Sequence, residues 1–411
     1  MSTVPQTDPM IFYPFTPEFM ADPYPHYAEL RTRVPVHEHP GGFWMLSRYD
    51  DVAELLRSGL SVEQSRVAPG PFRDAYAKAG VTDKPRLKGL ALLDRDPPDH
   101  TRLRRLVTQA FTVRAINALE PMIRALVDEA LDGIAEAGGG DLVESLAFPL
   151  PFTVISRMLG MPPIDTQHMR MLTTLLMRSV ELTMDPEVMR VIEAADAEIF
   201  GLVDEAVSQK RREPGDDLLT ALIAAEHDGD KLTHDELVAQ VTMLYVAGYE
   251  TSVNLISGGA LALLRHPEQL ELLRSRPELE HNAVEEVLRY YPPVHYSRRV
   301  TLEPYRVGGH DIPAGAFILA NLAGANRDES FWGPDAEELR LDRDNARRHL
   351  SFGGGMHHCL GATLARVEGR VALGELARRF PGLTIDGKVE WNGLVSLRGV
   401  SRLPVRACIQ A

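Results

Sequence analysis

The chain has 411 residues, enough for one large core or two domains, with the apolar content of a globular protein. Its net charge of −14 argues against general binding to nucleic acid. Two cysteines, Cys359 and Cys408, exclude a disulfide framework and fit a reducing compartment, the cytoplasm. Neither a signal peptide nor a membrane anchor is expected, because polar residues interrupt the longest apolar stretch.

Helices dominate the predicted elements. They are expected at residues 23–33, at 49–59 and almost continuously from 96 to 290. Short strands are expected at 37–47, 300–320 and 382–408. The sequence shows no repeat and no convincing linker. The prediction is therefore a single domain over 1–411, mainly α, with small β-sheets at one side.

The longest predicted helix begins at a capping box formed by Thr233 and Glu236, and it ends before Pro267. It would run about 30 residues, or roughly 45 Å at 1.5 Å per residue. That length is enough to cross the whole molecule.

The apolar middle of this helix contains a carboxylate, an alcohol and a glycine at one place, namely Glu250, Thr251 and Gly248. A buried carboxylate is costly unless it is paired or functional. Glycine inside a helix costs about 1 kcal/mol relative to alanine. Such local breaks tend to mark function. The alternative is that Thr251 bonds to a carbonyl one turn earlier and merely bends the helix.

The most informative run is 350–361, LSFGGGMHHCLG, which contains Cys359. Its three glycines permit backbone conformations closed to other residues and a close approach to a bulky flat group. A helix is predicted directly downstream, so Cys359 would lie at a helix N-terminus, where N–H groups and the dipole favour an anion. A single thiolate there suits an axial ligand to haem iron.

This run also resembles the haem-binding signature of the cytochrome P450 family, F-x-x-G-x-[R/H]-x-C-x-G, at Phe352, Gly355, His357, Cys359 and Gly361. The resemblance implies haem b with the Cys359 thiolate as its iron ligand, and haem contacts from Phe352 and Gly248. It also implies the family fold over essentially the whole chain, with the haem buried between the long central helix and the cysteine loop.

The segment from Ala247 to Thr251 resembles the oxygen-activation motif of the same family, A-G-x-[D/E]-T. The resemblance implies that Glu250 and Thr251 relay protons to dioxygen. Glu286 and Arg289, followed by two prolines, resemble the buried Glu–Arg pair of the family. On their own they could equally be an exposed ion pair at i,i+3 spacing. We interpret them as structural.

The two propionates of a haem need cationic or hydrogen-bonding partners. The run that begins at Asp96 resembles the family segment D-P-P-[E/D]-H-x-x-x-R and is expected to open a helix with Asp96 as N-cap. The implied propionate partners are His100, Arg104, Arg299 and His357. Because Arg298 precedes Arg299, the register there is open by one residue.

The substrate pocket is expected near residues 293–296. The resemblance implies that Val294 supplies apolar wall and that His295 or Tyr296 supplies one polar contact. Ala247 and Val395 should face the same space. The alternative is that His295 and Tyr296 point away and only pack.

Two further patterns are open to more than one interpretation. Arginines near the haem loop and the helix at 100 could form a docking face for an acidic ferredoxin, or be solvated surface. They are Arg102, Arg105, Arg343, Arg347, Arg348, Arg366 and Arg370. Seven of the 14 methionines fall between Met158 and Met189, as core filler or as an adaptable lid over the substrate entrance.

The resulting hypothesis is a bacterial haem-thiolate monooxygenase that inserts one atom of O2 into a lipophilic small molecule such as a terpenoid, steroid or polyketide. Electrons would come from a separate ferredoxin and reductase, because 411 residues leave no room for a flavin domain. Three alternatives remain: a peroxide-dependent peroxygenase of the same fold, a non-catalytic haem sensor or carrier, and a helical protein without haem.

Overall fold

The computed structural model describes residues 12–407 except 15, 64–86, 182–184 and 228. Its α-helices are α1 Pro17–Ala21, α2 Tyr24–Arg33, α3 Tyr49–Arg57, α5 Asp99–Ala110, α6 Val113–Asn117, α7 Glu120–Ala137, α8 Pro149–Leu159, α9 Thr166–Met177, α10 Pro186–Arg212, α11 Leu218–Ala224, α12 His234–Arg265, α13 Pro267–Ser275, α14 Glu280–Tyr290, α15 Leu322–Ala325, α16 Glu329–Trp332 and α17 Ala362–Arg379. Short 3-10 helices are η2 Leu87–Leu90, η3 Leu92–Asp94, η5 Arg178–Val180, η6 Pro277–Leu279, η7 Ala346–Arg348 and η8 Gly355–His357, and η4 Val143–Ala147 is a π-helix.

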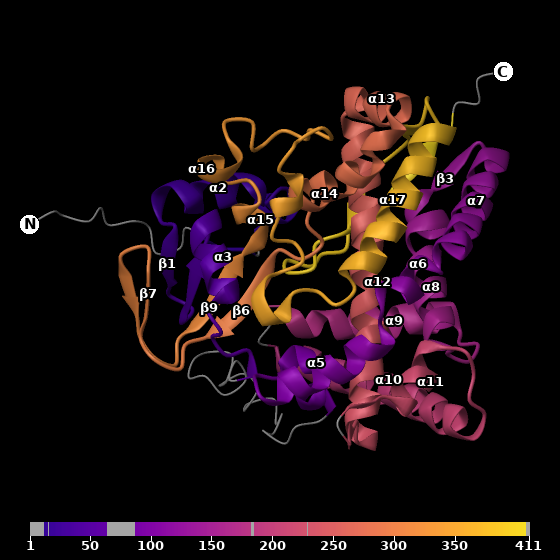
Figure 1. The fold of residues 1–411 in the computed structure, drawn as a ribbon. Coiled ribbons are helices and arrows are strands. Elements are labelled where there is room, and N and C mark those ends of the chain that lie inside the picture. The colour runs from indigo at the N-terminus through magenta and orange to yellow at the C-terminus, as the bar shows by residue number, and fades with distance from the viewer. Residues whose placement is uncertain (1–11, 15, 64–86, 182–184, 228, 408–411) are drawn as a thin grey trace, which may run out of the picture.

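The strands are short. They are β1 Val36–His39, β2 Phe43–Leu46, β3 Gly139–Asp141, β4 Glu226–His227, β5 Asp230–Lys231, β6 Tyr296–Val300, β7 Tyr305–Val307, β8 His310–Ile312, β9 Phe317–Asn321, β10 Thr384–Ile385, β11 Glu390–Trp391, β12 Val400–Arg402 and β13 Pro404–Arg406. The prediction of a mainly helical fold with small sheets is confirmed. The sheets do not all lie at one side, because β3, which pairs with β13, lies beside α7, across α12 from the sheet that contains β1, β6 and β9 (Figure 1).

Helix α12 runs through the helical half of the molecule, with α17 and α7 on one side of it and the largest sheet on the other (Figure 1). Its 32 residues begin at the predicted capping box, in which the Thr233 side chain accepts from the Glu236 N–H and the Glu236 side chain accepts from the Thr233 N–H. α12 packs against α17, α8, α10 and α14. The position of its middle residues is therefore fixed by contacts on several sides.

The largest sheet has the strand order β1-β2-β9-β6. The predicted hairpin is the antiparallel pair β1–β2, and β9 joins it by pairing parallel to β2 and antiparallel to β6. The order is non-sequential, so the sheet ties the start of the chain to residues near 300. Arg298 and Arg299 lie on β6, opposite Leu319 and Ile318 of β9.

Three hydrophobic cores support these elements. The largest fills the helical half, a second lies between α3 and the sheet, and a third packs aromatic side chains of α1 and α2 against β6 and β9. Val294 is partly buried against both the first and the second core. Among the residues that the structure describes, no helix is both long and apolar enough to cross a membrane.

Candidate active site

The cysteine loop is a tight backbone structure between η7 and α17. Gly353 and Gly355 have φ angles of 69° and 62°, in the left-handed region that other residues rarely adopt. A Cβ on Gly355 would lie 2.6 Å from the Leu56 carbonyl oxygen, so only glycine allows the loop to pack on α3. The Cys359 N–H donates to the Phe352 carbonyl at 2.9 Å, which closes the loop. Cys359 itself is exposed.

Opposing influences act on the Cys359 thiol. The protein atoms around the sulfur raise its pKa by burial, although the residue as a whole is exposed. Hydrogen bonds from the N–H groups of Gly361 and Ala362, at the start of α17, lower the pKa, as do the charges of Arg104 and Arg366. These groups stabilise a thiolate, the form of cysteine that binds iron.

In the middle of α12 one residue, Ala247, is exposed, whereas the residues around it are buried or partly buried. Its neighbours Val246 and Tyr249 are 5% and 2% exposed. Thr251, one turn on, donates from its hydroxyl to the Ala247 carbonyl at 2.8 Å. The hydrogen bond expected from the purely structural alternative is therefore present. The hydroxyl oxygen keeps its acceptor capacity beside this exposed position.

Glu250 has an unusual carboxyl group. Burial raises its pKa to about 7, and the charge of Arg170 acts in the opposite direction. A carboxyl with a pKa near 7 holds its proton about half of the time at neutral pH, so it can both donate and accept one. This property suits the predicted relay role.

A second buried acid, Glu368 on α17, was missed in the sequence analysis. It is 1% exposed, and its Oε2 has no hydrogen-bond partner among the described residues. Burial raises its pKa to about 8, while a hydrogen bond with Ser252, the residue after Thr251, lowers it. In the sequence, Glu368 appears only as one glutamate on a helix with many apolar residues. Its burial becomes evident only from the packing of α17 against α12.

Replacement of Glu368 by glutamine should change how stability depends on pH. The folded carboxyl has a pKa of about 8 against a reference of 4.5, so between these values the native state binds more protons than the unfolded state. Stability therefore falls as pH rises through this range, by at most a few kcal/mol at about 1.4 kcal/mol per pKa unit. Relative to the parent, Glu368→Gln should gain stability between pH 5 and pH 8 in urea denaturation. A constant difference at every pH would contradict the buried acid.

The four predicted propionate partners lie close to one another. The rings of His100 and His357 are 4.3 Å apart, and His100 Nε2 and both ring nitrogens of His357 have no partner among the described residues. Burial lowers the pKa of His357 to about 3, and the neighbouring His100 adds to this. Arg104 donates from Nη2 to the His358 carbonyl at 2.8 Å, so it reaches the cysteine loop.

Arg299 and its neighbour Arg298 have different surroundings. Arg299 is 4% exposed and donates only to Ser297 Oγ and the Arg298 carbonyl, and no carboxylate of the described chain pairs with it. Burial lowers its pKa to about 10. Arg298 instead pairs with Asp94 at 3.2 Å. A buried cation and imidazole nitrogens without partners are costly in the protein alone, and they fit the two carboxylates of a haem.

The N-cap prediction at Asp96 is wrong. Helix α5 begins at Asp99, with Pro98 as its N-cap residue. The Asp96 carboxylate accepts from the Val62 N–H at 2.9 Å and from the Ser61 hydroxyl. Because these partners are distant in sequence, local capping rules could not identify them. His100 and Arg104 still share one face of α5.

The Glu286–Arg289 pair is completely buried, with both side chains 0% exposed. Two bonds of 2.7 Å join the guanidinium to the carboxylate. Arg289 also donates to the carbonyls of Asn326, Ala336 and Glu338, at 2.9, 2.6 and 2.6 Å. The pair therefore holds α14 to the segment before the cysteine loop, and it is no surface ion pair.

Two of the predicted pocket residues pack elsewhere. His295 is 1% exposed, and its Nδ1 lies 2.9 Å from the Tyr27 hydroxyl, to which Tyr296 also donates. Val395 is 5% exposed and belongs to the same aromatic core. For His295 and Tyr296 the packing alternative is thus what the structure shows, because the Tyr27 hydroxyl of α2 contacts the imidazole and the Tyr296 hydroxyl donates to Tyr27. Val294 and Ala247 keep positions consistent with the prediction.

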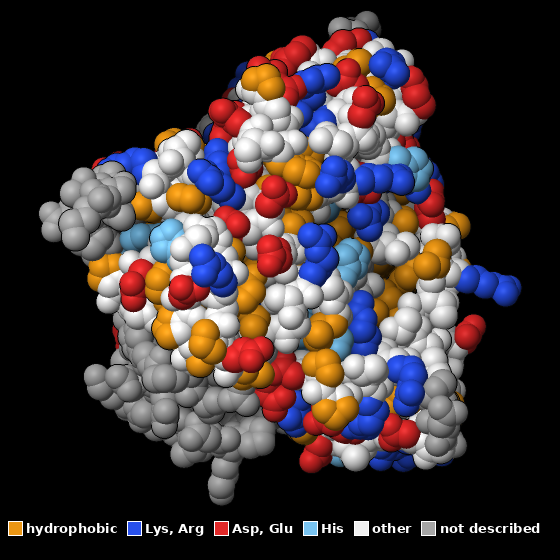
Figure 2. Space-filling view, turned by 60° about the vertical axis from the view of Figure 1, so that its left-hand side comes forward, with side chains coloured by type: hydrophobic (Ala, Val, Ile, Leu, Met, Phe, Trp, Pro, Cys, Tyr) orange, Lys and Arg blue, Asp and Glu red, His pale blue; other side chains and the backbone are white. Residues whose placement is uncertain are grey.

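The proposed basic face is smaller than expected. Arg343 is 4% exposed and bonded to Glu286 and Asp335, and Arg370 is 11% exposed and paired with Glu120, so neither is free to dock a partner. Arg347 is 72% exposed and Arg105 is also exposed. Figure 2 shows basic side chains with histidines in a band on one face, interspersed with acidic ones.

The methionine-rich region is divided between packing and surface. Met169, Met177 and Met189 are buried, which is the core-filler alternative, whereas Met171 is 51% exposed. Met158 and Met161 are partly buried against the largest core. Met184 lies outside the described residues.

The cytochrome P450 family model matches residues 35–407. The P450 monooxygenase PikC of Streptomyces venezuelae is 39% identical over 95% of this chain and 92% of its own, and the vitamin D(3) 25-hydroxylase of Pseudonocardia autotrophica is 39% identical over 95% of each chain. The solved structure of the Bacillus subtilis P450 PksS has a TM-score of 0.85 at 34% identity, covering 97% of this chain and 100% of its own.

The chain therefore belongs to the cytochrome P450 family. It is an oxidoreductase with a haem cofactor, and it uses O2 together with a redox partner.

Proposed function

We propose that the protein is a haem b monooxygenase in which the Cys359 thiolate is the iron ligand, acting on a lipophilic small molecule in the cytoplasm, with residues 1–411 forming one P450 domain. The observation that supports it most is the exposed Cys359 on a glycine-rich loop whose N–H groups and arginines favour an anion. Thiolate-ligated haem, when bound, supplies the chemistry that cleaves the O–O bond.

The residues around this cysteine would hold the cofactor. His100, Arg104, Arg299 and His357 would bind the propionates. His100 Nε2 and both ring nitrogens of His357 have no hydrogen-bond partner among the described residues. The ring of Phe352 would offer a flat surface to the macrocycle. Gly248 would contact the macrocycle through its backbone, because a Cβ on this residue would lie 3.4 Å from Ile155 Cδ1 and so point toward α8. Arg366 stacks over Phe352 with its guanidinium carbon 4.6 Å from the ring centre, so this ring is fixed in place.

Glu250 and Thr251 would deliver protons to the reacting oxygen. Glu250 is protonated about half of the time at neutral pH because burial raises its pKa to about 7. The Thr251 hydroxyl donates to Ala247 at rest and can accept a proton through its free lone pairs. The two side chains come from adjacent positions of one rigid helix, which fixes their geometry.

Thr251→Ala tests this proposal. The variant should still bind substrate and consume reductant, but release hydrogen peroxide. Product formation should fall by about 10- to 1000-fold, the scale of a lost acid–base group. Product, peroxide and reductant are measured in the same reaction. Thr242→Ala, in the same helix, is the matched control and should stay coupled. Unchanged coupling in Thr251→Ala would exclude the relay.

A ferredoxin is the proposed electron donor. Arg105 and Arg347 are exposed basic residues of the predicted docking face. Turnover should depend on added ferredoxin and reductase. Product formation at the same rate with hydrogen peroxide alone would instead support the peroxygenase alternative.

The proposed substrate is largely apolar, with one or two hydrogen-bonding groups, such as a polyketide, terpenoid or steroid. Support comes from relatives described as a 6-deoxyerythronolide B hydroxylase and a vitamin D(3) 25-hydroxylase, 38% and 39% identical, and from a similar P450 structure with testosterone. Composition alone does not choose among these classes.

Val294→Trp should block substrate binding or move the site of oxidation. Val294 packs against two hydrophobic cores. A tryptophan ring at this position would therefore extend into the proposed substrate pocket. Binding is followed by the haem spin-state shift, and products by mass spectrometry, while the carbon-monoxide spectrum should stay intact. Leu302→Trp, at a residue 63% exposed, is the surface control. An unchanged product pattern and affinity would remove Val294 from the pocket.

A further inference from the structure

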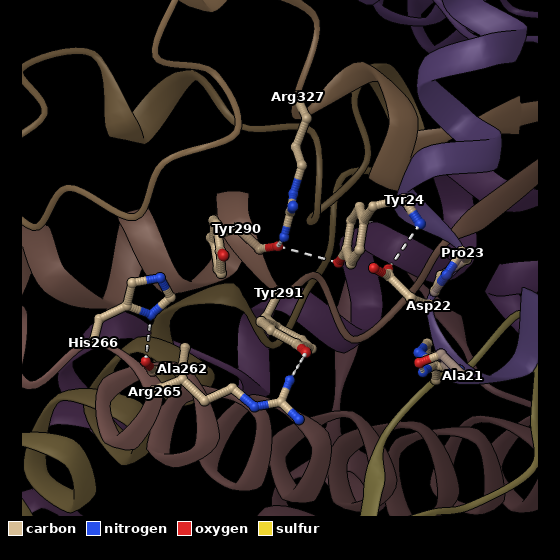
Figure 3. Close-up of a pocket in the computed structure, with 11 residues that line it drawn as sticks. Ala21, Asp22, Pro23, Tyr24, Ala262, Arg265, His266, Tyr290, Tyr291 and Arg327 are labelled. Carbon is tan, nitrogen blue, oxygen red and sulfur yellow. Dashed lines mark hydrogen bonds between the residues drawn. The ribbon is translucent and has the colours of Figure 1, made fainter. Parts of the chain in front are cut away.

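A cavity of about 290 Å³ lies where the C-terminal ends of α12 and α14 meet the start of α2 (Figure 3). None of the residues assigned above to haem, proton relay or substrate lines it. Its walls come from five separate parts of the chain, near residues 22, 265, 291, 327 and 398. A volume near 300 Å³ is at the lower end of small-molecule sites, so the cavity suits a compact ligand.

Positive charge dominates the lining. Three arginines line the cavity, Arg265, Arg327 and Arg398, together with one carboxylate, that of Asp22. Arg327 is paired with Glu337 at 2.9 Å, so Arg265 and Arg398 carry the remaining positive charge. Arg398 is 6% exposed and donates to the carbonyls of Met20 and Ala21, and no carboxylate of the described chain pairs with it.

Arg265 is exposed, and its one hydrogen bond among the described residues goes to the Tyr291 hydroxyl at 3.5 Å. The buried arginine is Arg398, and a buried cation without a paired carboxylate is costly, so an anion in the cavity would compensate its charge. In a chain of net charge −14, this local excess of positive charge is unusual.

Aromatic rings form much of the remaining wall. The Arg327 guanidinium lies 3.4 Å from the ring centre of Tyr24 and 4.0 Å from that of Tyr290, as Figure 3 shows from the side. These ring faces are already occupied by a cation, so a second cation gains nothing from them. Tyr291 lies across the cavity with its hydroxyl toward Arg265. Because Arg327 covers the faces of Tyr24 and Tyr290, the aromatic surface left beside Arg265 is that of Tyr291. This surface beside a guanidinium fits an aromatic ring that carries an anionic group.

We propose that this cavity binds a small aromatic carboxylate, with its carboxylate on the guanidinium of Arg265 and its ring against Tyr291. Guanidinium and carboxylate form paired, charge-assisted hydrogen bonds. Arg265 offers four further N–H groups for this pairing beyond the one used by Tyr291. The site is separate from the proposed monooxygenase function and does not depend on it.

The test is calorimetric titration of the haem-loaded enzyme with benzoate, in the presence of saturating imidazole to occupy the haem. We expect saturable binding of one benzoate, with a dissociation constant of about 0.01–1 mM for a ligand of this size. Arg265→Gln should weaken binding about tenfold or more, the effect of losing a charge-assisted hydrogen bond. Arg306→Gln, at an arginine 76% exposed and outside the cavity, removes the same charge and should bind as the parent does.

Neutral benzamide, which has the same shape, should bind at least tenfold more weakly than benzoate, because it lacks the charge. Three results would overturn the proposal: no saturable binding, equal affinity in Arg265→Gln and Arg306→Gln, or equal affinity for benzamide. Loss of benzoate binding on addition of imidazole would assign the ligand to the haem site instead. No turnover is needed, so failure of the proposed function would leave this result unaffected.

Discussion

Cys359→Ser is expected to remove the red-shifted band of the reduced carbon-monoxide complex and to reduce monooxygenase activity to background. Serine keeps the size of the side chain, but its hydroxyl does not ionise near neutral pH, so it cannot supply a thiolate ligand. The N–H groups of Gly361 and Ala362 and the charges of Arg104 and Arg366 would then face a neutral group.

The matched control is Cys408→Ser, which changes the other cysteine and should leave both the band and the activity unchanged. Haem content is measured in parallel, because a loop without its ligand can lose the cofactor altogether. Survival of the thiolate band in Cys359→Ser would show that the assignment of the ligand is wrong.

Glu286→Ala is expected to yield little soluble, haem-loaded protein. Removing one partner of a buried pair leaves an uncompensated charge and costs about 3–5 kcal/mol. That is a large part of a typical stability of about 5–15 kcal/mol. Arg289 would keep its three backbone carbonyl partners but lose both bonds to the carboxylate. Soluble yield, haem content and urea denaturation report the change.

The chain contains a natural control for this experiment. Glu271 and Arg274 form a pair at the same i,i+3 spacing on α13, but their side chains are 55% and 40% exposed. Glu271→Ala should therefore behave nearly as the parent does, since exposed pairs contribute little. Similar behaviour of Glu286→Ala and Glu271→Ala would contradict the structural role of the buried pair.

These two pairs illustrate the limit of a local pattern. Glu286–Arg289 and Glu271–Arg274 have the same residues at the same spacing, yet one is buried and the other is on the surface. Spacing reports which side chains share a helix face, whereas burial depends on what packs against that face. Resemblance to a family distinguished the two pairs in the sequence, and physical reasoning from spacing could not.

The features that the sequence determined by itself follow from capping, glycine and periodicity rules that act over short stretches of chain. The capping box fixed the start of α12 at Thr233, and the glycines before Cys359 indicated a tight loop ahead of a helix. The prediction of small sheets beside a helical domain followed from hydrophobic periodicity. Each of these features depends on residues within a few positions of one another, which is why a sequence can show them.

Tertiary structure alone decided the features that join distant segments. Arg298 pairs with Asp94, whereas Arg299 has no paired carboxylate among the described residues. The His295 ring contacts the Tyr27 hydroxyl, and Glu368 is buried beside α12. The cavity around Arg265 is likewise formed by segments hundreds of residues apart. The physical reason is that burial, and with it the pKa and the pairing of a polar side chain, depends on every element packed around it, and no local pattern in the sequence encodes those neighbours.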